Sequence, residues 1–239
     1  MKIGVFDSGI GGINVLKKLI EKYPNNHYIY FGDTLNIPYG EKSIHDLERL
    51  SSNIIEFLLK NDVDLIVIAC GTVSSNCYHY LKNKYDVLIY DIISPTIDYL
   101  NKCQFNNIGV IGTSKTIESN IFNIKNKNVL MKKTPSFVPI IENNLINEKK
   151  EEIKKELSDF LNTDILVLGC THYPLLKPII DTLNINTLDM GECLVNNLNL
   201  SNDSKMKIDL YFSKIDYNLM NNLNINFKYD YQIHYYVIK

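Results

Sequence analysis

The chain has 239 residues, of which 45% are hydrophobic and 22% charged, and its formal net charge is -2. This length allows one large core or two smaller ones. The near-neutral charge leaves no basic excess that would attract nucleic acid or an anionic membrane, so we expect a small-molecule substrate or a protein partner.

Short apolar runs alternate with longer stretches of helical periodicity, the clearest of which is 43–60. Alternation of this kind is typical of α/β proteins with parallel sheets. In the tail, we expect strands at 207–212 and 225–229 around a helix near 216–223, and an edge strand without an assignable role in 229–239. The earlier runs predicted to be buried strands are, in chain order, 2–6, 28–31, 65–69, 87–90, 108–111 and 165–168.

Two segments are repeated in weaker form later in the chain. GVFDSGIGG, from Gly4, resembles GVIGTSKTI, from Gly109, and VIACGT resembles VLGCTH. The repeats predict two similar α/β domains with mainly parallel sheets, related by a pseudo-twofold axis. We expect the first to comprise 1–93 and 192–239 and the second 94–191, with the active site in the cleft between them, where ligands meet strand ends.

The amino terminus turns polar at Asp7, too early for the apolar region of a signal peptide, and no run approaches the roughly 18 apolar residues of a membrane span. We therefore expect a cytoplasmic protein without membrane contact. The DSGIGG run lacks the GxGxxG spacing and any Walker lysine, which argues against nucleotide binding.

Five cysteines without CxxC pairs argue against a disulfide framework and a structural zinc site. Cys70 and Cys170 differ from the others because each closes a predicted strand and opens onto a turn with threonine. A thiol at a helix N-terminus is expected to have a lowered pKa. Two such thiols on opposite walls of a cleft suggest a base and an acid that invert a substrate carbon. The remaining three, Cys77, Cys103 and Cys193, are expected to pack as small hydrophobes.

Three further residues are candidates to assist the thiols. Asp7 ends the first predicted strand, although it could also cap the helix that follows. His172 lies two residues after Cys170 and could be an acid/base helper or a hydrogen-bonded structural residue. Glu142 is singled out only by its place after FVPII, which reads as a strand end. The other histidines, at 27, 45, 79 and 234, are expected to be structural or exposed.

Six motifs together resemble the glutamate racemases of the cofactor-independent aspartate/glutamate racemase superfamily. They span most of the chain up to residue 195, and the segment FSKIDYNLMNNL is similar to the carboxyl-terminal helix region of that family only weakly. The motifs are FDSGIGG (6–12), FGDTLNIPYGEKS (31–43), IACGT (68–72), GVIGTSKTIES (109–119), FVPIIE (137–142) and LGCTHYPLL (168–176).

The resemblance implies interconversion of L- and D-glutamate without a cofactor or metal, with the D form supplying peptidoglycan, and it implies a homodimer. It implies that Cys70 and Cys170 are the acid/base pair and that Asp7, Glu142 and His172 assist them. The implied substrate contacts are Asp7, Ser8, Pro38, Tyr39, Gly40, Gly71, Thr72, Thr113, Thr116, Thr171 and His172.

One position departs from the family pattern. Gly71 stands where familiar members have asparagine in CNT, so a side-chain amide that could hold the substrate is replaced by backbone. Two alternatives stay open. The chain could be an aspartate racemase or another amino-acid racemase of the superfamily, or a catalytically weak homologue that binds a ligand or regulates.

Overall fold

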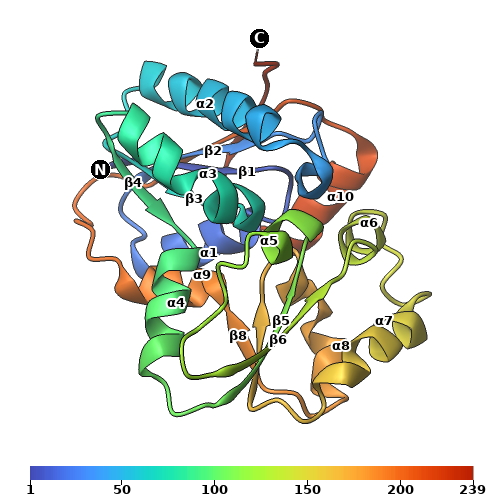
Figure 1. Ribbon diagram of the computed structural model, residues 1–239. Helices are drawn as coiled ribbons and strands as arrows, with labels where there is room; N and C mark the ends of the chain where they lie inside the picture. Colours follow the sequence, from blue (N-terminus) through green and yellow to red (C-terminus); the bar gives the residue numbers. More distant parts are fainter. Residues whose placement is uncertain (239) are drawn as a thin grey trace.

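The computed structural model describes residues 1–238 and contains two separate parallel sheets (Figure 1). The first has the order β10-β9-β2-β1-β3-β4 and the second the order β6-β5-β7-β8. The first is built from β1 (Lys2–Asp7), β2 (His27–Gly32), β3 (Leu65–Ile68), β4 (Leu88–Asp91), β9 (Lys207–Phe212) and β10 (Gln232–Tyr235). The second is built from β5 (Asn107–Gly112), β6 (Asn128–Lys133), β7 (Ile165–Leu168) and β8 (Thr187–Asp189). The predicted α/β class with parallel sheets is confirmed.

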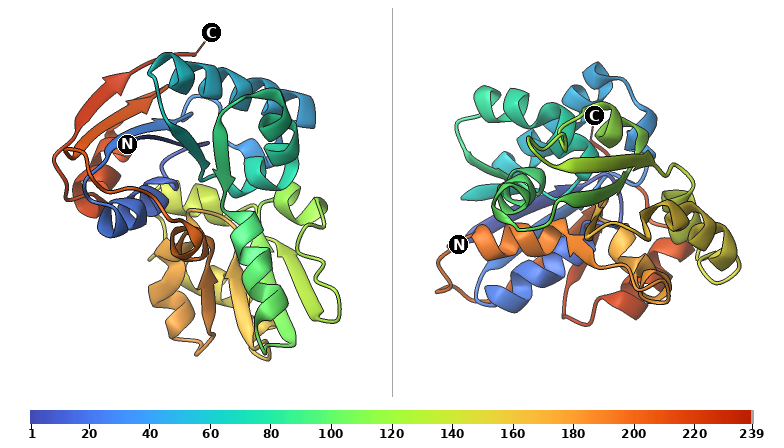
Figure 2. Two further views of the ribbon diagram at one scale, coloured as in Figure 1. Left: turned by 90° about the vertical axis from the view of Figure 1, so that its left-hand side faces the viewer. Right: turned by 60° about the horizontal axis from the view of Figure 1, so that its bottom comes forward.

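The two sheets repeat one strand order, because β2-β1-β3-β4 in the first corresponds to β6-β5-β7-β8 in the second. The strands β9 and β10, orange to red in Figure 2, extend the sheet that contains β1 and β2. The strands thus divide between the sheets at the predicted domain boundaries, while the domain division itself stays a prediction. Cys70 and Cys170 occupy equivalent places, shortly after β3 and β7.

Ten helices cover the sheets in the described part of the chain. They are α1 (Ile13–Lys22), α2 (Ile44–Lys60), α3 (Gly71–Lys84), α4 (Ile93–Lys102), α5 (Ser114–Glu118), α6 (Phe137–Glu142), α7 (Lys150–Leu157), α8 (Lys177–Asp181), α9 (Met190–Asn197) and α10 (Tyr217–Asn226). The predicted helix at 43–60 is confirmed, and it begins where the Ser43 hydroxyl accepts a hydrogen bond from the Asp46 N–H at 3.1 Å. No helix within residues 1–238 is sufficiently long and apolar to span a membrane.

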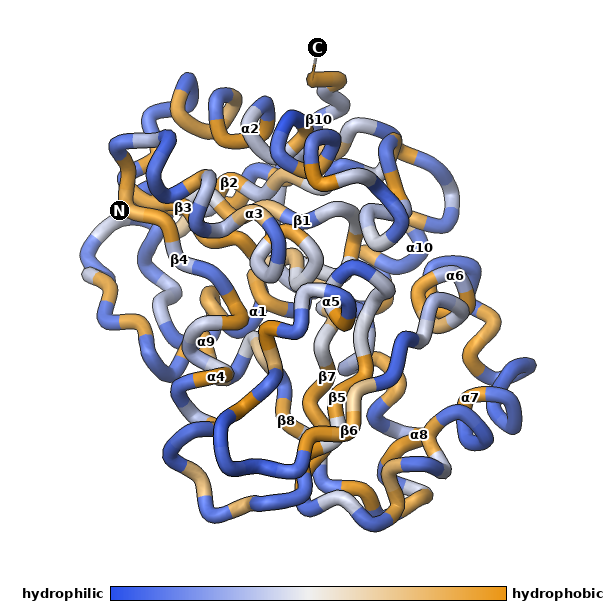
Figure 3. Tube along the Cα trace, viewed as in Figure 1, coloured by the Kyte–Doolittle hydropathy of each residue, from blue (hydrophilic) through white to orange (hydrophobic). Residues whose placement is uncertain are grey.

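One hydrophobic core is shared by both sheets. It joins Val5 and Val67 of the first sheet to Val110 and Val167 of the second, and α1, α4 and α9 fill the space with residues such as Leu194. Separate cores lie on the opposite face of each sheet. Figure 3 shows the hydrophobic runs of β5 and β7 and, at the right of the view, the mostly hydrophilic α7. The shared core fixes how the two sheets lie relative to each other.

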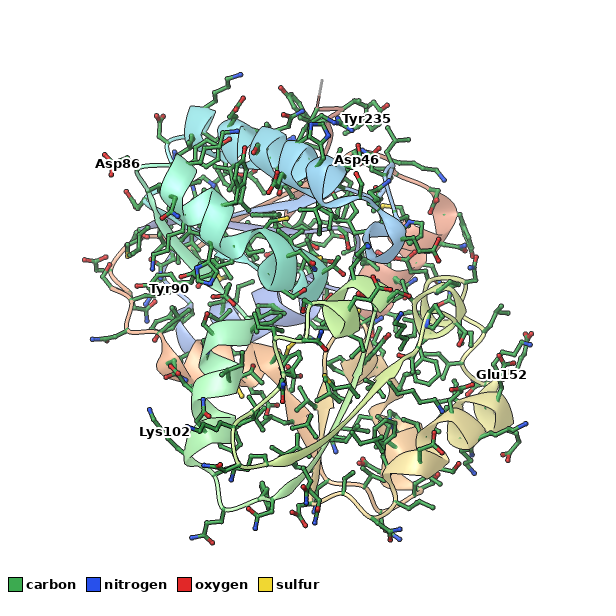
Figure 4. All side chains as sticks on the ribbon, in the orientation of Figure 1. Asp46, Asp86, Tyr90, Lys102, Glu152 and Tyr235 are labelled. Carbon is green, nitrogen blue, oxygen red and sulfur yellow. The ribbon has the colours of Figure 1, made fainter. Side chains whose placement is uncertain are left out.

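Charged side chains lie on the outside of the molecule. Lys102, the last residue of α4, and Glu152 on α7 are exposed and project away from the sheets (Figure 4). Few charged groups are buried, and among these are Asp7, Asp33 and His172. These exceptions lie close to the strand ends where the candidate site is found.

Two sequence-based predictions are corrected by the structure. The strand predicted at 225–229 is wrong, because α10, capped by Asp216 and anchored by buried Leu219 and Leu223, continues to Asn226. The strand lies at Gln232–Tyr235, where it is an edge strand paired with β9. FVPIIE forms helix α6 and not a strand end, since Phe137, Ile140 and Ile141 bury one helical face.

Two strands of the second sheet are absent from the predictions. β6 reads NVLMKK and carries two lysines, and β8 has only three residues. Neither forms an apolar run that would predict a buried strand.

Candidate active site

A cavity opens at the strand ends between the two sheets, and both Cys70 and Cys170 line it. The first half of the chain contributes Ser8, Ile37, Pro38, Tyr39, Gly40, Glu41, Cys70, Gly71 and Thr72. The second half contributes Thr113, Ser114, Thr134, Pro135, Val138, Pro139, Glu142, Cys170, Thr171 and His172. The predicted cleft is therefore present. The roles of its residues stay predictions.

Cys70 occupies the N-cap position of α3 without a side-chain capping hydrogen bond, and it is 4% exposed. Its sulfur lies 3.6 Å from the Ser8 hydroxyl. Burial raises the pKa of the Cys70 thiol to about 12, and the charge of Asp7 adds to this rise. Contacts with the Val73 backbone and with Ser8 act in the opposite direction but do not outweigh burial. The predicted lowering of the pKa at this helix N-terminus is thus wrong for Cys70, because desolvation exceeds the effect of the helix end.

Asp7 lies behind the cavity wall and does not line it. Its Oδ2 accepts hydrogen bonds from the backbone N–H groups of Gly9, at 3.1 Å, and Gly12, at 3.0 Å. Its Oδ1 accepts one from the Thr171 hydroxyl at 3.3 Å. Asp7 therefore braces the turn before α1 and connects it to the second half of the chain, while its charge acts on Cys70.

The Cys170 side has different partners. The Cys170 sulfur lies 3.6 Å from Nδ1 of His172, and Nε2 of the same ring lies 3.0 Å from Oε1 of Glu142. Burial alone would lower the pKa of His172, but the contacts with Cys170 and Glu142 outweigh it and raise this pKa well above its usual value. The imidazole is therefore held in its protonated form between a sulfur and a carboxylate.

The glycines of DSGIGG leave room for this arrangement. A Cβ on Gly11 would lie 2.4 Å from Oγ1 of Thr171 and 2.5 Å from Nδ1 of His172. A Cβ on Gly9 would lie 3.0 Å from Oε1 of Glu142. The run is glycine-rich because the second half of the chain packs against its backbone, which is a different use from a phosphate loop.

Threonine hydroxyls close another side of the cavity. Thr72, on α3, lies 2.9 Å from Thr113 between their Oγ1 atoms, and Thr113 lies 3.0 Å from Thr116. Thr113 also caps α5. Thr116 is fully buried and stands outside the cavity lining, so among the predicted substrate contacts it and Asp7 are the two that the wall separates from the cavity.

Gly71 packs against the end of β7. A Cβ at this position would lie 2.7 Å from the carbonyl oxygen of Gly169 and 3.3 Å from Cε of Met190. The backbones that carry Cys70 and Cys170 therefore approach each other directly. The glycine that departs from the CNT pattern is therefore the residue at which the two backbones come close.

Part of the cavity wall and of its support was not predicted from the sequence. Ile37, Glu41, Ser114, Thr134, Pro135, Val138 and Pro139 line the cavity without having been predicted. Asp33 is buried and accepts hydrogen bonds from Tyr39, Asn36 and Ser213, which holds the segment that carries Tyr39 and Gly40. The polar residues after β2, in FGDTLNIPYG, could have indicated from the sequence that this segment belongs to the site.

The remaining cysteines and histidines lie outside the cavity lining. Cys77 and Cys193 are buried in cores, and Cys103 is half-buried. His45 and His79 are exposed, whereas His27 and His234 both contact the buried carboxylate of Asp209. Within residues 1–238 no group of three His, Cys, Asp or Glu side chains could hold a metal ion.

Comparison with known proteins identifies the family. The family model described as Asp/Glu/Hydantoin racemase matches residues 3–198. The chain belongs to the Asp/Glu/Hydantoin racemase family. A glutamate racemase from Aquifex aeolicus is 38% identical, with 92% of this chain and 91% of the relative covered.

Solved structures of this racemase family have the same architecture. Glutamate racemase from Aquifex pyrophilus is 33% identical, with a TM-score of 0.80 and 98% of each chain covered. Glutamate racemase from Francisella tularensis, solved in complex with D-glutamate, is 27% identical, with a TM-score of 0.87, covering 100% of this chain and 98% of the other. The chain is an amino-acid racemase.

In this racemase, replacing Glu142 by Gln should lower the pKa of His172, because the carboxylate that stabilises the imidazolium is lost. An NMR titration of the histidine side chains measures this pKa. Glu118→Gln is the matched control, since Glu118 pairs only with surface lysines. An unchanged His172 titration in Glu142→Gln would contradict the geometry.

The raised pKa of His172 also makes the stability of the folded protein depend on pH. Because the folded pKa of His172 is raised, its contribution to the free energy of unfolding is fully present below the unfolded value of about 6.5 and is lost as the pH rises through the folded pKa. Stability measured by denaturant unfolding should therefore fall less over this alkaline window in Glu142→Gln than in the wild type.

Proposed function

We propose that the chain is a glutamate racemase that interconverts L- and D-glutamate with two thiols and no cofactor. The observation that carries the proposal is that Cys70 and Cys170, each shortly after the equivalent strand of a sheet with the same order, line one cavity. The glutamate racemases among the relatives support glutamate as the substrate.

The two sides of the cavity suit opposite roles at the start of a cycle. With its pKa raised to about 12, Cys70 stays a protonated thiol and can donate a proton. The imidazolium of His172 lies against the Cys170 sulfur and can stabilise a thiolate, which then acts as the base. One sulfur removes the α-proton from one face and the other sulfur donates a proton to the opposite face.

Hydroxyls and backbone amides would hold the substrate. Ser8, Thr72, Thr113 and Thr171 surround the cavity with hydroxyl groups. The N-terminus of α3 presents backbone N–H groups beginning at Gly71, and helix N-termini attract carboxylates. These groups would bind the substrate carboxylates and, by opposing the charge of the α-carboxylate, favour loss of the α-proton.

The biological role follows from the product. D-glutamate made in the cytoplasm would supply peptidoglycan synthesis, and we propose that the protein acts there as a homodimer. The likeness to glutamate racemases supports this role.

Aspartate is the competing substrate within the family. Incubation in heavy water with L-Glu or L-Asp should give α-carbon deuteration and racemisation with glutamate, and much slower exchange with aspartate, because the relatives that support the proposal are glutamate racemases. Mass spectrometry and chiral chromatography measure both. Exchange with aspartate alone would reject the glutamate assignment, and ligand binding without any exchange would support a catalytically weak homologue.

Replacing each thiol in turn tests the mechanism. Cys70→Ser should lower exchange from one glutamate enantiomer by roughly 10²-fold or more, and Cys170→Ser should do so from the other, because each sulfur serves one face. Cys77→Ser is the control, since Cys77 is a core residue outside the cavity. Full activity in both variants would contradict the two-thiol mechanism.

A further inference from the structure

The segment that follows β9 lies beside the segment that follows β2. The two strands pair in parallel, and their register places Phe212, the last residue of β9, beside Gly32, the last residue of β2. The next residues along the chain, Ser213 and Asp33, are therefore neighbours at the end of the sheet where the cavity lies, and both are buried. β9 and everything after it lie beyond residues 3–198, to which the family model is matched, so that match assigns them no role.

Residues 33–41, which follow β2, form a segment that we call the cavity loop. It packs against the second half of the chain on one side, since a Cβ on Gly40 would lie 2.8 Å from Cβ of Thr113. The contacts on its other side therefore decide where this part of the cavity wall lies. The residues that the loop contributes to the wall are Ile37, Pro38, Tyr39, Gly40 and Glu41.

Ser213 holds the cavity loop through two hydrogen bonds. Its hydroxyl donates to Oδ1 of Asp33 at 2.7 Å and accepts from the backbone N–H of Leu35 at 2.8 Å. The other carboxylate oxygen of Asp33 accepts a hydrogen bond from the Tyr39 hydroxyl at 2.6 Å. Hydrogen bonds to a carboxylate are stronger than those between neutral groups. A single buried carboxylate thus connects Ser213 to a residue of the cavity wall.

A second pair of hydrogen bonds joins the same two segments. The Thr34 hydroxyl donates to the carbonyl oxygen of Lys214 at 2.6 Å and accepts from the Lys214 N–H at 2.9 Å. The backbone N–H of Ser213 donates to the carbonyl oxygen of Gly32 at 3.2 Å, which extends the pairing of the two strands by one step. Residues that are 180 positions apart in the sequence are thereby held side by side behind the cavity wall.

We propose that Ser213 is a positioning residue of the racemase, which holds the cavity loop in the place that substrate binding requires. Ser213 does not line the cavity, so it acts through Asp33 and Tyr39 and not by touching the substrate. This inference rests on the proposed function. It adds that the C-terminal part of the chain, for which no role could be assigned from the sequence, takes part in substrate binding.

Loss of the Ser213 hydroxyl should weaken substrate binding more than proton transfer. The two sulfur atoms follow β3 and β7, which pair with strands other than β9, whereas the cavity loop has to be ordered whenever substrate binds. Ser213→Ala should therefore raise KM for both glutamate enantiomers roughly tenfold and change kcat by less than about threefold. Racemisation kinetics followed by chiral chromatography measure both constants.

Three further variants separate positioning from general stabilisation. Ser213→Thr keeps the hydroxyl and should return KM to near the wild-type value. Ser51→Ala is the matched control, because it removes a buried hydroxyl that donates to carbonyl groups of its own helix, and it should leave KM unchanged. Thr34→Val removes the neighbouring pair of hydrogen bonds at a less buried position and should also raise KM. It decides the question if Ser213→Ala does not fold.

A measurement without substrate keeps this inference separate from the proposed function. Hydrogen–deuterium exchange followed by mass spectrometry reports how firmly backbone amides are held. The amides of the cavity loop should exchange faster in Ser213→Ala than in the wild type, because the Leu35 N–H loses its acceptor and the Asp33 carboxylate loses a donor. Exchange in β3 should not change.

The outcomes are distinct. Unchanged KM in a folded Ser213→Ala, or in Thr34→Val where Ser213→Ala does not fold, would overturn the positioning role. A fall in kcat at constant KM, an equal rise of KM in Ser51→Ala, or unchanged exchange in the cavity loop would also overturn it. Absence of racemisation by the wild-type protein would instead reject the proposed function, and the exchange measurement would still show whether Ser213 holds the loop.

Discussion

The arrangement of the site depends on a backbone contact between the two halves of the chain. Gly71, directly after Cys70, packs against Gly169, directly before Cys170, so closely that a Cβ on Gly71 would lie 2.7 Å from the Gly169 carbonyl oxygen. The strands that deliver the two cysteines are buried and hydrogen-bonded in their sheets. The positions of both thiols are consequently set by rigid elements and by one close contact, and the cavity is the space that remains beside it.

The surroundings of the two thiols are chemically unequal although the strand orders that place them are the same. Cys70 lies near a buried carboxylate, which opposes ionisation, while Cys170 lies against an imidazole that a second carboxylate keeps protonated. An inverting reaction that runs in both directions needs one proton donor and one proton acceptor at any moment. In the proposed mechanism the unequal partners would provide this difference before substrate arrives, and the shared core of the two sheets holds the strands that carry them in place.

The sequence predicted the architecture because buried parallel strands are apolar along their whole length, and the runs ending near Asp7, Cys70 and Cys170 are of this kind. It failed for β6 and β8, where charge or shortness hides the pattern, and for α10, whose C-terminal turn looks like a strand. That Cys70 and Cys170 belong to one site could be predicted from the sequence, because each follows an equivalent strand. The raised pKa of Cys70 was not, because its burial depends on residues such as Phe6 and Tyr39 that are distant from it in the sequence. The contact of Glu142 with His172 also required coordinates, since α6 reads as a strand end in the sequence.

The proposed mechanism requires that one substrate carbon is held between two sulfur atoms. A crystal structure of the protein with glutamate bound measures this most directly. We expect the α-carbon to lie within about 4 Å of both the Cys70 and the Cys170 sulfur atoms, on opposite faces, close to van der Waals contact. An α-carbon in contact with one sulfur only, or glutamate bound outside the cavity between the sheets, would contradict it.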